Sequence, residues 1–144
     1  MIRVLHLADL EVWSEQRITL WPHLDIAEAK AEATAMLQDP DQQAYGAFTQ
    51  DGAMIGFVEV SLRAYAEGCE SSPVGYLEGW FVAAEHRRSN LGRMLVQAAE
   101  DWSRARGCSE MASDVLLDNP ISQHAHIRLG YEEVERVVLY RKGL

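Results

Sequence analysis

Residues 86–95, HRRSNLGRML, place cationic and hydroxyl side chains at the beginning of an apolar helical pattern. The polar side chains are Arg87, Arg88, Ser89 and Arg93. The first amides of a helix have no partners inside it and carry partial positive charge. The segment therefore suits an anion such as phosphate, although a solvated basic cap would use the same residues. It lacks both the Gly-Lys-Ser/Thr end of a P-loop and the repeated glycines of a dinucleotide fingerprint.

Three acidic residues stand where a cationic ligand could bind. Glu78 lies inside an apolar strand pattern, where a carboxylate is costly unless it is solvated or paired, for example with a structural arginine. Asp114 follows another strand, at the end where ligand sites often gather, or it caps the next turn. Glu135 lies in EEVE, which is also typical of a solvated acidic turn. Strand alternation predicts that Tyr76, Glu78 and Trp80 share one face.

Length and composition exclude several classes of protein. The chain has 144 residues, of which 48% are hydrophobic, so we expect one domain over residues 1–144. A net charge of −9 argues against nucleic-acid binding and is compatible with a cationic ligand. Cys69 and Cys108 have no metal-type spacing, and the histidines form no convincing metal site. The chain shows neither a signal-peptide pattern nor about 20 consecutive apolar residues, so we expect a cytoplasmic protein.

The apolar periodicity predicts the order β-α-α-β-β-β-α-β-α-β, a mixed α/β fold with an antiparallel first half. The expected ranges are strand 2–7, helices 9–21 and 25–39, strands 43–49, 51–65 and 74–82, helix 90–107, strand 109–117, helix 119–130 and strands within 131–142. The helix at 90–107 is expected to bury one face. Its members are Leu91, Met94, Leu95, Ala98 and Trp102.

The segment VAAEHRRSNLGRMLVQAAEDWSRARGC resembles the pyrophosphate-binding segment of the GCN5-related N-acetyltransferase superfamily. That family's pattern, Arg/Gln-x-x-Gly-x-Gly/Ala, runs here from Arg87 to Gly92. Asn90 stands where the family usually has glycine, and asparagine is the non-glycine residue that best tolerates positive φ. A second family pattern falls on Asn119, Ser122, His126, Gly130 and Tyr131. His126 occupies the position of a tyrosine that in many members protonates the leaving thiolate.

Further segments resemble bacterial aminoglycoside 6'-N-acetyltransferases. They are LWP, LEGWFV, HRRS, ASDVLLDN, ISQHAH and ERVV, which together span most of the chain. The resemblance implies a mostly antiparallel sheet flanked by helices, in which strand 74–82 splays from strand 109–115. It also implies direct attack of an amine on acetyl-coenzyme A, without a metal and without a covalent enzyme intermediate. A homodimer is expected, with VERVVLYRK as the candidate contact.

The resemblance also assigns roles to residues. The coenzyme contacts would be the backbone near Phe81 and Val82, then Arg87, Arg88, Ser89, Asn90, Leu91, Gly92 and Arg93, and Asn119, unless Asn119 only neighbours a helix cap. The sugar site would contain Trp21, Tyr65, Glu78, Asp114 and Glu135. Trp21 and Tyr65 are equally typical of core residues. Glu78, Asp114 and His126 are the candidate catalytic groups.

Two other functions fit the same residues. The acidic set does not define a sugar, so another small amine, such as a polyamine or an amino-acid-like metabolite, is an alternative acceptor. A protein that binds aminoglycoside, or senses coenzyme A, without turnover is the second alternative. His126 is also compatible with a surface histidine beside His124, although its unperturbed pKa suits an acid.

Overall fold

The computed structural model describes all residues 1–144. The strands are β1 (Ile2–Val4), β2 (Gln42–Phe48), β3 (Met54–Arg63), β4 (Val74–Val82) and β5 (Met111–Ser113). The helices are α1 (Leu10–Leu20), α2 (Ile26–Gln38), α3 (Leu91–Ala105) and α4 (Pro120–Arg128), with short 3-10 turns η1 (Leu7–Asp9) and η2 (Ala84–His86). The five strands form one sheet in the order β1-β2-β3-β4-β5. Only β4 and β5 are parallel, so the predicted mixed, mostly antiparallel sheet is confirmed.

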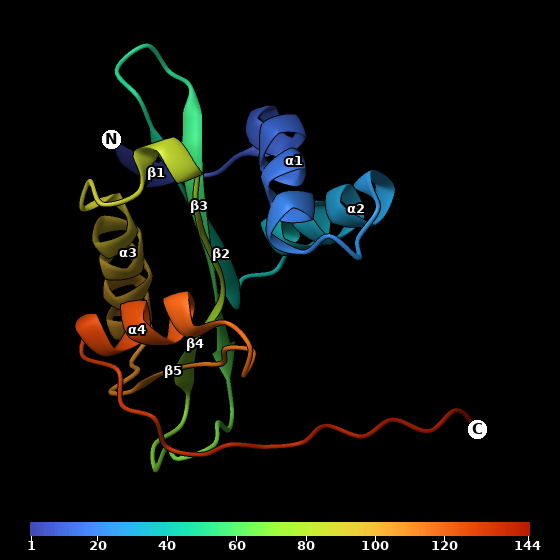
Figure 1. The fold of residues 1–144 in the computed structure, drawn as a ribbon, viewed down its shortest axis with the longest axis vertical. Helices are drawn as coiled ribbons and strands as arrows, with labels where there is room; N and C mark the ends of the chain where they lie inside the picture. The colour runs from blue at the N-terminus through green and yellow to red at the C-terminus, as the bar shows by residue number, and fades with distance from the viewer.

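Helices cover both faces of this sheet (Figure 1). On one face, Leu95, Val96 and Ala99 of α3 pack with sheet residues such as Val58 and Leu77. On the other face, a second set of buried side chains joins α1 and α2 to the sheet. Its members are Leu5, Trp13, Ala33, Met36, Ala44, Phe48 and Phe57.

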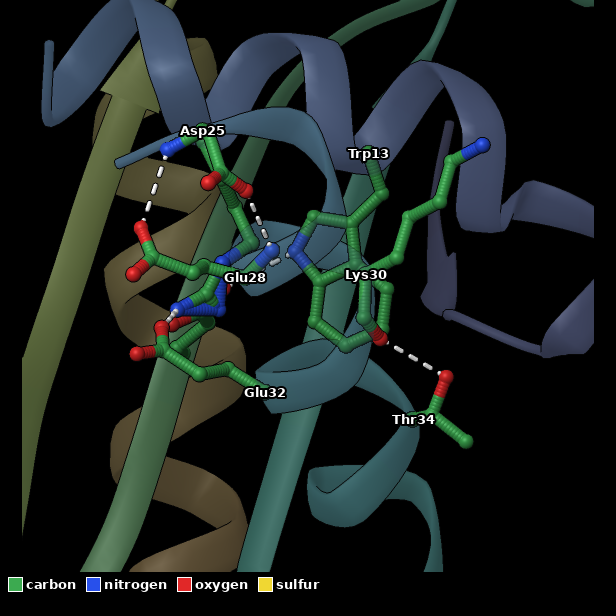
Figure 2. Close-up of polar contacts among 8 residues, drawn as sticks. Trp13, Asp25, Glu28, Lys30, Glu32 and Thr34 are labelled. Carbon is green, nitrogen blue, oxygen red and sulfur yellow. Dashed lines mark hydrogen bonds and ion pairs between the residues drawn. The ribbon is translucent and has the colours of Figure 1, made fainter.

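Polar contacts fix α2 and attach α1 to β3. Asp25 caps α2 as predicted, because its carboxylate accepts a hydrogen bond from the Glu28 amide at 2.8 Å. In return, the Glu28 carboxylate accepts from the Asp25 amide at 3.1 Å (Figure 2). On α1, the indole of Trp13 donates to the buried Glu59 carboxylate of β3 at 2.9 Å. Arg17 bridges the same carboxylate, at 3.2 Å, to Glu32 of α2, at 2.5 Å. A buried hydrogen-bonded pair of this kind fixes how the two helices lie against the sheet.

A bulge in β4 corrects one prediction. Glu59 pairs with Gly79 and Val60 pairs with Leu77, so Glu78 is an extra residue in the ladder. An extra residue shifts the alternation of side chains beyond it. Trp80 therefore packs into the α3-side core, and Glu78 bonds to side chains of the opposite face. The prediction that the two share a face was wrong, because strict alternation does not anticipate a bulge.

The parallel pairing of β4 with β5 is short. It covers Gly75, Tyr76 and Leu77 against Met111, Ala112 and Ser113, and β5 then ends. β4 continues to Val82 with β3 on one side and no strand on the other. The predicted splay is therefore present, and the expected strand at 109–117 is shorter than its sequence suggested.

Two further predictions need correction. The expected last strands within 131–142 are absent. Tyr131 packs against the α3-side core and Val134 lies against Gly68, and the chain beyond them extends away from the body without regular structure (Figure 1). The face of α3 is also displaced, since Met94 is 43% exposed and the fully covered residues include Val96 and Ser103. Ser103 is buried because its side chain packs against the backbone of Gly75. A side chain at position 75 would collide with it.

Candidate active site

The basic turn before α3 has two non-glycine residues in the left-handed region. Asn90, the N-cap of α3, has φ 66°, so its predicted positive φ is confirmed. Arg88 has φ 65°, which is less common for a long side chain. Left-handed residues that recur within one turn indicate a backbone shaped for something other than a simple helix cap.

The backbone amides of residues 88–93 donate to no acceptor within the protein. The first amide to join the α3 ladder is that of Met94, which bonds to the Asn90 carbonyl at 3.1 Å. The side chain of Asn90 caps none of these amides. A run of unpaired amides at the positive end of a long helix is an anion-binding arrangement.

The side chains of the turn divide into structural and free groups. Arg87 donates through Nε to the Val82 carbonyl at 2.9 Å, and the Ser89 hydroxyl donates to the His86 carbonyl. Arg88 makes no hydrogen bond or ion pair, so its charge is available to a ligand. Arg93 reaches toward the Arg128 carbonyl of α4 at 3.5 Å.

Glycine at position 92 lets the α3 backbone approach β4. A Cβ there would lie 3.0 Å from the Trp80 ring, so a larger side chain would push the helix start away from the strand. The glycine that ends the sequence motif thus has a packing reason in this fold.

The free edge of β4 presents an unpaired amide beside this turn. The Ala83 amide bonds to Ile55 on the β3 side at 2.9 Å. Because successive amides of a strand point to opposite sides, Val82 presents its amide to the side that β5 has left. The Phe81 amide faces β3, so of these two predicted carbonyl-binding amides the geometry favours Val82.

A network of polar side chains lies on the α1–α2 side of β3 and β4. Arg63 donates to the two carboxylate oxygens of Glu78, through Nε at 3.0 Å and through Nη2 at 2.8 Å. The Ser61 hydroxyl donates to the same carboxylate at 2.5 Å. The Arg63 guanidinium also stacks over the Tyr76 ring at 3.4 Å. Glu78 thus has the structural arginine that sequence analysis left open as one alternative.

Asp114 joins this network through Tyr76. The tyrosine hydroxyl donates to Asp114 Oδ2 at 2.5 Å, and this bond together with burial raises the pKa of Tyr76. Asp114 itself is exposed, and its Oδ1 makes no bond within the protein. The bulge and the strand ends therefore bring two predicted carboxylates into one network.

A groove of about 1240 Å³ opens beside β5 and α4. Four of the predicted site residues line it, namely Tyr65, Asp114, His126 and Glu135. Tyr65 is 66% exposed, so it is not a core residue. Trp21 and Glu78 do not line the groove; Trp21 lies half-buried against Gly79, beside Phe57.

His126 is held in one orientation inside this region. Its Nδ1 lies 2.7 Å from the Ser122 carbonyl, and its Nε2 lies 2.8 Å from the Ser113 hydroxyl. Trp80 and Tyr131 meet the ring edge to face at 5.4 and 5.6 Å. His126 is therefore a packed and bonded residue, unlike an ordinary surface histidine.

Asn119 is the N-cap of α4. Its side chain accepts from the Ser122 amide at 3.1 Å, with Pro120 following in the first turn as predicted. A contact between Asn119 and the coenzyme stays a prediction.

Sequence analysis missed three residues of this region, Arg63, Tyr76 as a polar group, and Ser113. Each lies across a strand pair or a helix contact from a predicted residue, so its partner depends on a register that the sequence does not show. The Asp, Glu, His and Cys side chains form no group of three or more that could hold a metal ion. No helix has both the length and the apolar character needed to cross a membrane.

The acetyltransferase (GNAT) family model matches residues 7–131, which includes the basic turn, the splayed strands and α4. The chain belongs to this family. The matched range contains both the open β4 edge and the unpaired amides at the start of α3.

Individual acetyltransferases resemble this member of the family over their whole length. An aminoglycoside N(6')-acetyltransferase type 1 of Serratia marcescens is 41% identical over 145 residues, covering 100% of this chain and 99% of the relative. The structure of AAC(6')-Iy in complex with the bisubstrate analogue CoA-S-monomethyl-acetylneamine has a TM-score of 0.94 at 40% identity, covering 100% of this chain and 98% of that one. An aminoglycoside 6'-N-acetyltransferase of Acinetobacter baumannii has a TM-score of 0.93 at 36% identity, with coverage of 100% and 98%.

Proposed function

We propose that this protein transfers the acetyl group of acetyl-coenzyme A to the 6'-amine of an aminoglycoside, by direct attack in a ternary complex. The observation that carries the proposal is the run of unpaired amides at 88–93, next to a β4 edge that no strand covers. Full-length similarity to aminoglycoside 6'-N-acetyltransferases supplies the acceptor class. The lost positive charge weakens attraction to RNA phosphates, so the consequence is antibiotic resistance.

The coenzyme would be held by the backbone of 88–93 and by nearby cationic side chains. Arg88 and Arg93 add positive charge near the pyrophosphate, and Arg87 supports the turn by binding the Val82 carbonyl. The Val82 amide is the donor best placed for charge that develops on the thioester oxygen. Phe81, Ser89, Asn90, Leu91 and Gly92 would shape this surface, and Asn119 would approach it from α4.

The acceptor would bind on the acidic side of the sheet. The network holds two carboxylates, Glu78 and Asp114, and one cation, Arg63, which binds Glu78, so it keeps a net negative charge that suits a polycationic sugar. Asp114 has an unbonded oxygen that would accept from an amine, directly or through water. Glu78 would bind an amine by giving up its contact with Arg63 for a contact with the ligand ammonium. Tyr65 and Glu135 would line the groove around the sugar, and Trp21 would form a wall nearer Gly79.

The deciding experiment is thiol release from acetyl-coenzyme A with several amines. We expect release with kanamycin and tobramycin, and none with spermidine or with an aminoglycoside that lacks the 6'-amine. Release with spermidine or with that analogue would replace the proposal by a broader amine acetyltransferase. Tight aminoglycoside binding without any release would replace it by a sequestering protein.

Variants separate the two binding regions. Glu78→Ala and Asp114→Ala should each weaken aminoglycoside binding, measured by calorimetry, and leave coenzyme A binding nearly unchanged. Gly92→Val should do the reverse, because its side chain would press on Trp80. Equal loss of both ligands in the carboxylate variants would indicate a structural role for these residues.

We also propose that residues 1–144 act as a single domain that forms a homodimer in the cytoplasm. The support for the dimer is the extended segment after α4, in which Leu139 and Tyr140 are 89% and 92% exposed, and β5, an edge strand with unpaired backbone groups. Leu139→Glu should shift the mass measured by light scattering toward the monomer. Val12→Glu, the same kind of change at an exposed position of α1, should not. A wild-type protein that is monomeric at micromolar concentration would contradict the dimer.

A further inference from the structure

Ser113 lies at the point where the two parallel strands separate. It is the last residue of β5, and its pairing with Leu77 is the last rung of the β4–β5 ladder. The next chain element beyond this rung is the loop that leads to α4. The Ser113 hydroxyl therefore lies at the inner end of the gap that opens beside β4.

Hydrogen bonding fixes the tautomer of the neighbouring His126. A carbonyl oxygen can only accept, so the contact of Nδ1 with the Ser122 carbonyl at 2.7 Å requires a proton on Nδ1. A neutral His126 then has its lone pair on Nε2, and the Ser113 hydroxyl donates to it at 2.8 Å. When His126 gains a second proton, Nε2 becomes the donor, and the Ser113 hydroxyl, which also lies 3.4 Å from the Leu77 carbonyl, can donate to another acceptor.

The hydrogen bond to Ser113 is the contact that joins the imidazole to the end of β5. One ring nitrogen is bound to the α4 backbone, and Trp80 and Tyr131 pack against the ring. No carboxylate binds either nitrogen. The charged and titratable groups around the ring are Asp114 beside Ser113, Glu100 of α3 through its 3.3 Å bond to Tyr131, and His124 and Arg128 on α4.

We propose that Ser113 gives the proton to the departing thiolate and that His126 resupplies it. The inference rests on the proposed acetyl transfer. As the amine nitrogen bonds to the acetyl carbon and the carbon–sulfur bond breaks, the sulfur keeps the bonding electrons and takes the Ser113 hydroxyl proton. Nε2 of the protonated His126 returns a proton to the serine oxygen, and His126 is left neutral with Nδ1 still bound to Ser122. The proton released by the attacking amine reaches solvent, from which His126 is protonated again.

The relay predicts a specific pH profile. His126 must be protonated to resupply the serine, so kcat should fall toward alkaline pH. Ser113→Ala should lower kcat about 10- to 100-fold and remove this alkaline decline, with the KM for acetyl-coenzyme A within about twofold. Ser113→Thr, which keeps the hydroxyl, should restore much of both. The double variant with His126→Ala should be no slower than the slower single variant.

The experiment measures thiol release from about pH 5.5 to about pH 9 for wild type and these variants, with the exposed Ser109→Ala as the control serine. If Ser113→Ala keeps the alkaline decline, whatever its kcat, His126 acts without the serine and the relay is wrong. A Ser113→Ala enzyme with wild-type kcat would also overturn it. Lack of turnover with every amine would overturn the proposed function and the relay together, whereas turnover with an intact decline overturns the relay alone.

Discussion

Two arginine–glutamate pairs lie on the same face of the sheet, and they have opposite surroundings. Each uses one residue of β3, Glu59 in one pair and Arg63 in the other. The side chains of Arg17 and Glu59 are 5% and 2% exposed, and Trp13 completes the bonding of the carboxylate. The side chains of Arg63 and Glu78 are 43% and 29% exposed and lie at the acidic network. The same ion pair therefore occurs once inside the α1–α2 layer and once at the candidate acceptor site.

Burial decides what each pair can do. Removing two charges from water is costly, and only good mutual geometry offsets that cost. Neither member of a buried pair can therefore exchange its partner for a ligand. A partly exposed pair contributes little to stability and can exchange one partner for a ligand cation. Arg17–Glu59 therefore holds α1 and α2 on the sheet, and we propose that Arg63–Glu78 takes part in ligand binding.

The largest expected effect is on the buried pair. Arg17→Met leaves the Glu59 carboxylate inside the protein with only Trp13 as donor, and should lower the free energy of unfolding by about 3–5 kcal/mol. The loss should be greater at pH 8 than at pH 5, because Glu59 can take up a proton at the lower pH. Urea unfolding at both pH values measures this. Arg63→Met is the matched control, with an expected loss of about 1 kcal/mol or less.

The second effect is the pH dependence of stability. Burial raises the pKa of Glu59 to about 7, against the opposing influence of Arg17. Between the ordinary carboxyl pKa and about 7, the folded protein holds a proton that the unfolded chain releases, so stability falls as pH rises through this window. In Glu59→Gln the side chain is a neutral amide that does not titrate in this window.

We therefore expect Glu59→Gln to gain stability relative to wild type as pH rises from about 5 to about 8. The comparison uses unfolding midpoints across the window, with Glu78→Gln as the matched carboxylate variant. A Glu59→Gln curve parallel to that of wild type would show that Glu59 is ionised throughout.

The two pairs also show what sequence could predict. The basic turn before α3 was predictable because its determinants are contiguous: Arg87 to Gly92 set the turn, the charge and the helix start. The left-handed Asn90 was expected because the resembled family has glycine there and asparagine tolerates positive φ. The fold order was predictable for the same reason up to α4. For Glu78 a structural arginine was one alternative, but which arginine was not predicted, and the Arg17–Glu59 pair was not predicted at all. Each pair joins residues 15 or more positions apart through a strand register or a helix packing angle.

The remaining errors have equally local causes. The β4 bulge at Glu78 moved Trp80 to the other face. Glycine inside a strand often marks a bulge, and Gly79 follows Glu78, but the prediction used strict alternation alone. The apolar residues after Tyr131 have strand character, but a strand forms only where a partner edge is available. Nothing in the sequence distinguished Ser113 from other strand serines, because its contact with His126 depends on how α4 packs against β5.

A third prediction tests the exposed pair in binding. Glu78→Gln keeps the shape of the side chain and removes its charge, so we expect the KM for kanamycin to rise about 10-fold while stability changes by less than about 1 kcal/mol. Glu59→Gln should leave that KM within about twofold, because the carboxylate faces Trp13 and Arg17. A larger KM change at position 59 than at position 78 would reverse the assignment of the two pairs.

The smallest effect concerns the shape of the exposed cation. Arg63→Lys keeps the charge but loses the two-ended grip on Glu78 and the flat stacking on Tyr76. Stability should stay within about 0.5 kcal/mol of wild type, since both partners remain solvated. The KM for kanamycin should fall slightly or stay equal, because a weaker contact between position 63 and Glu78 competes less with binding of the ligand ammonium. A KM that rises as much as in Glu78→Gln would instead show that the rigid Arg63–Glu78 geometry, rather than the negative charge alone, forms the acceptor site.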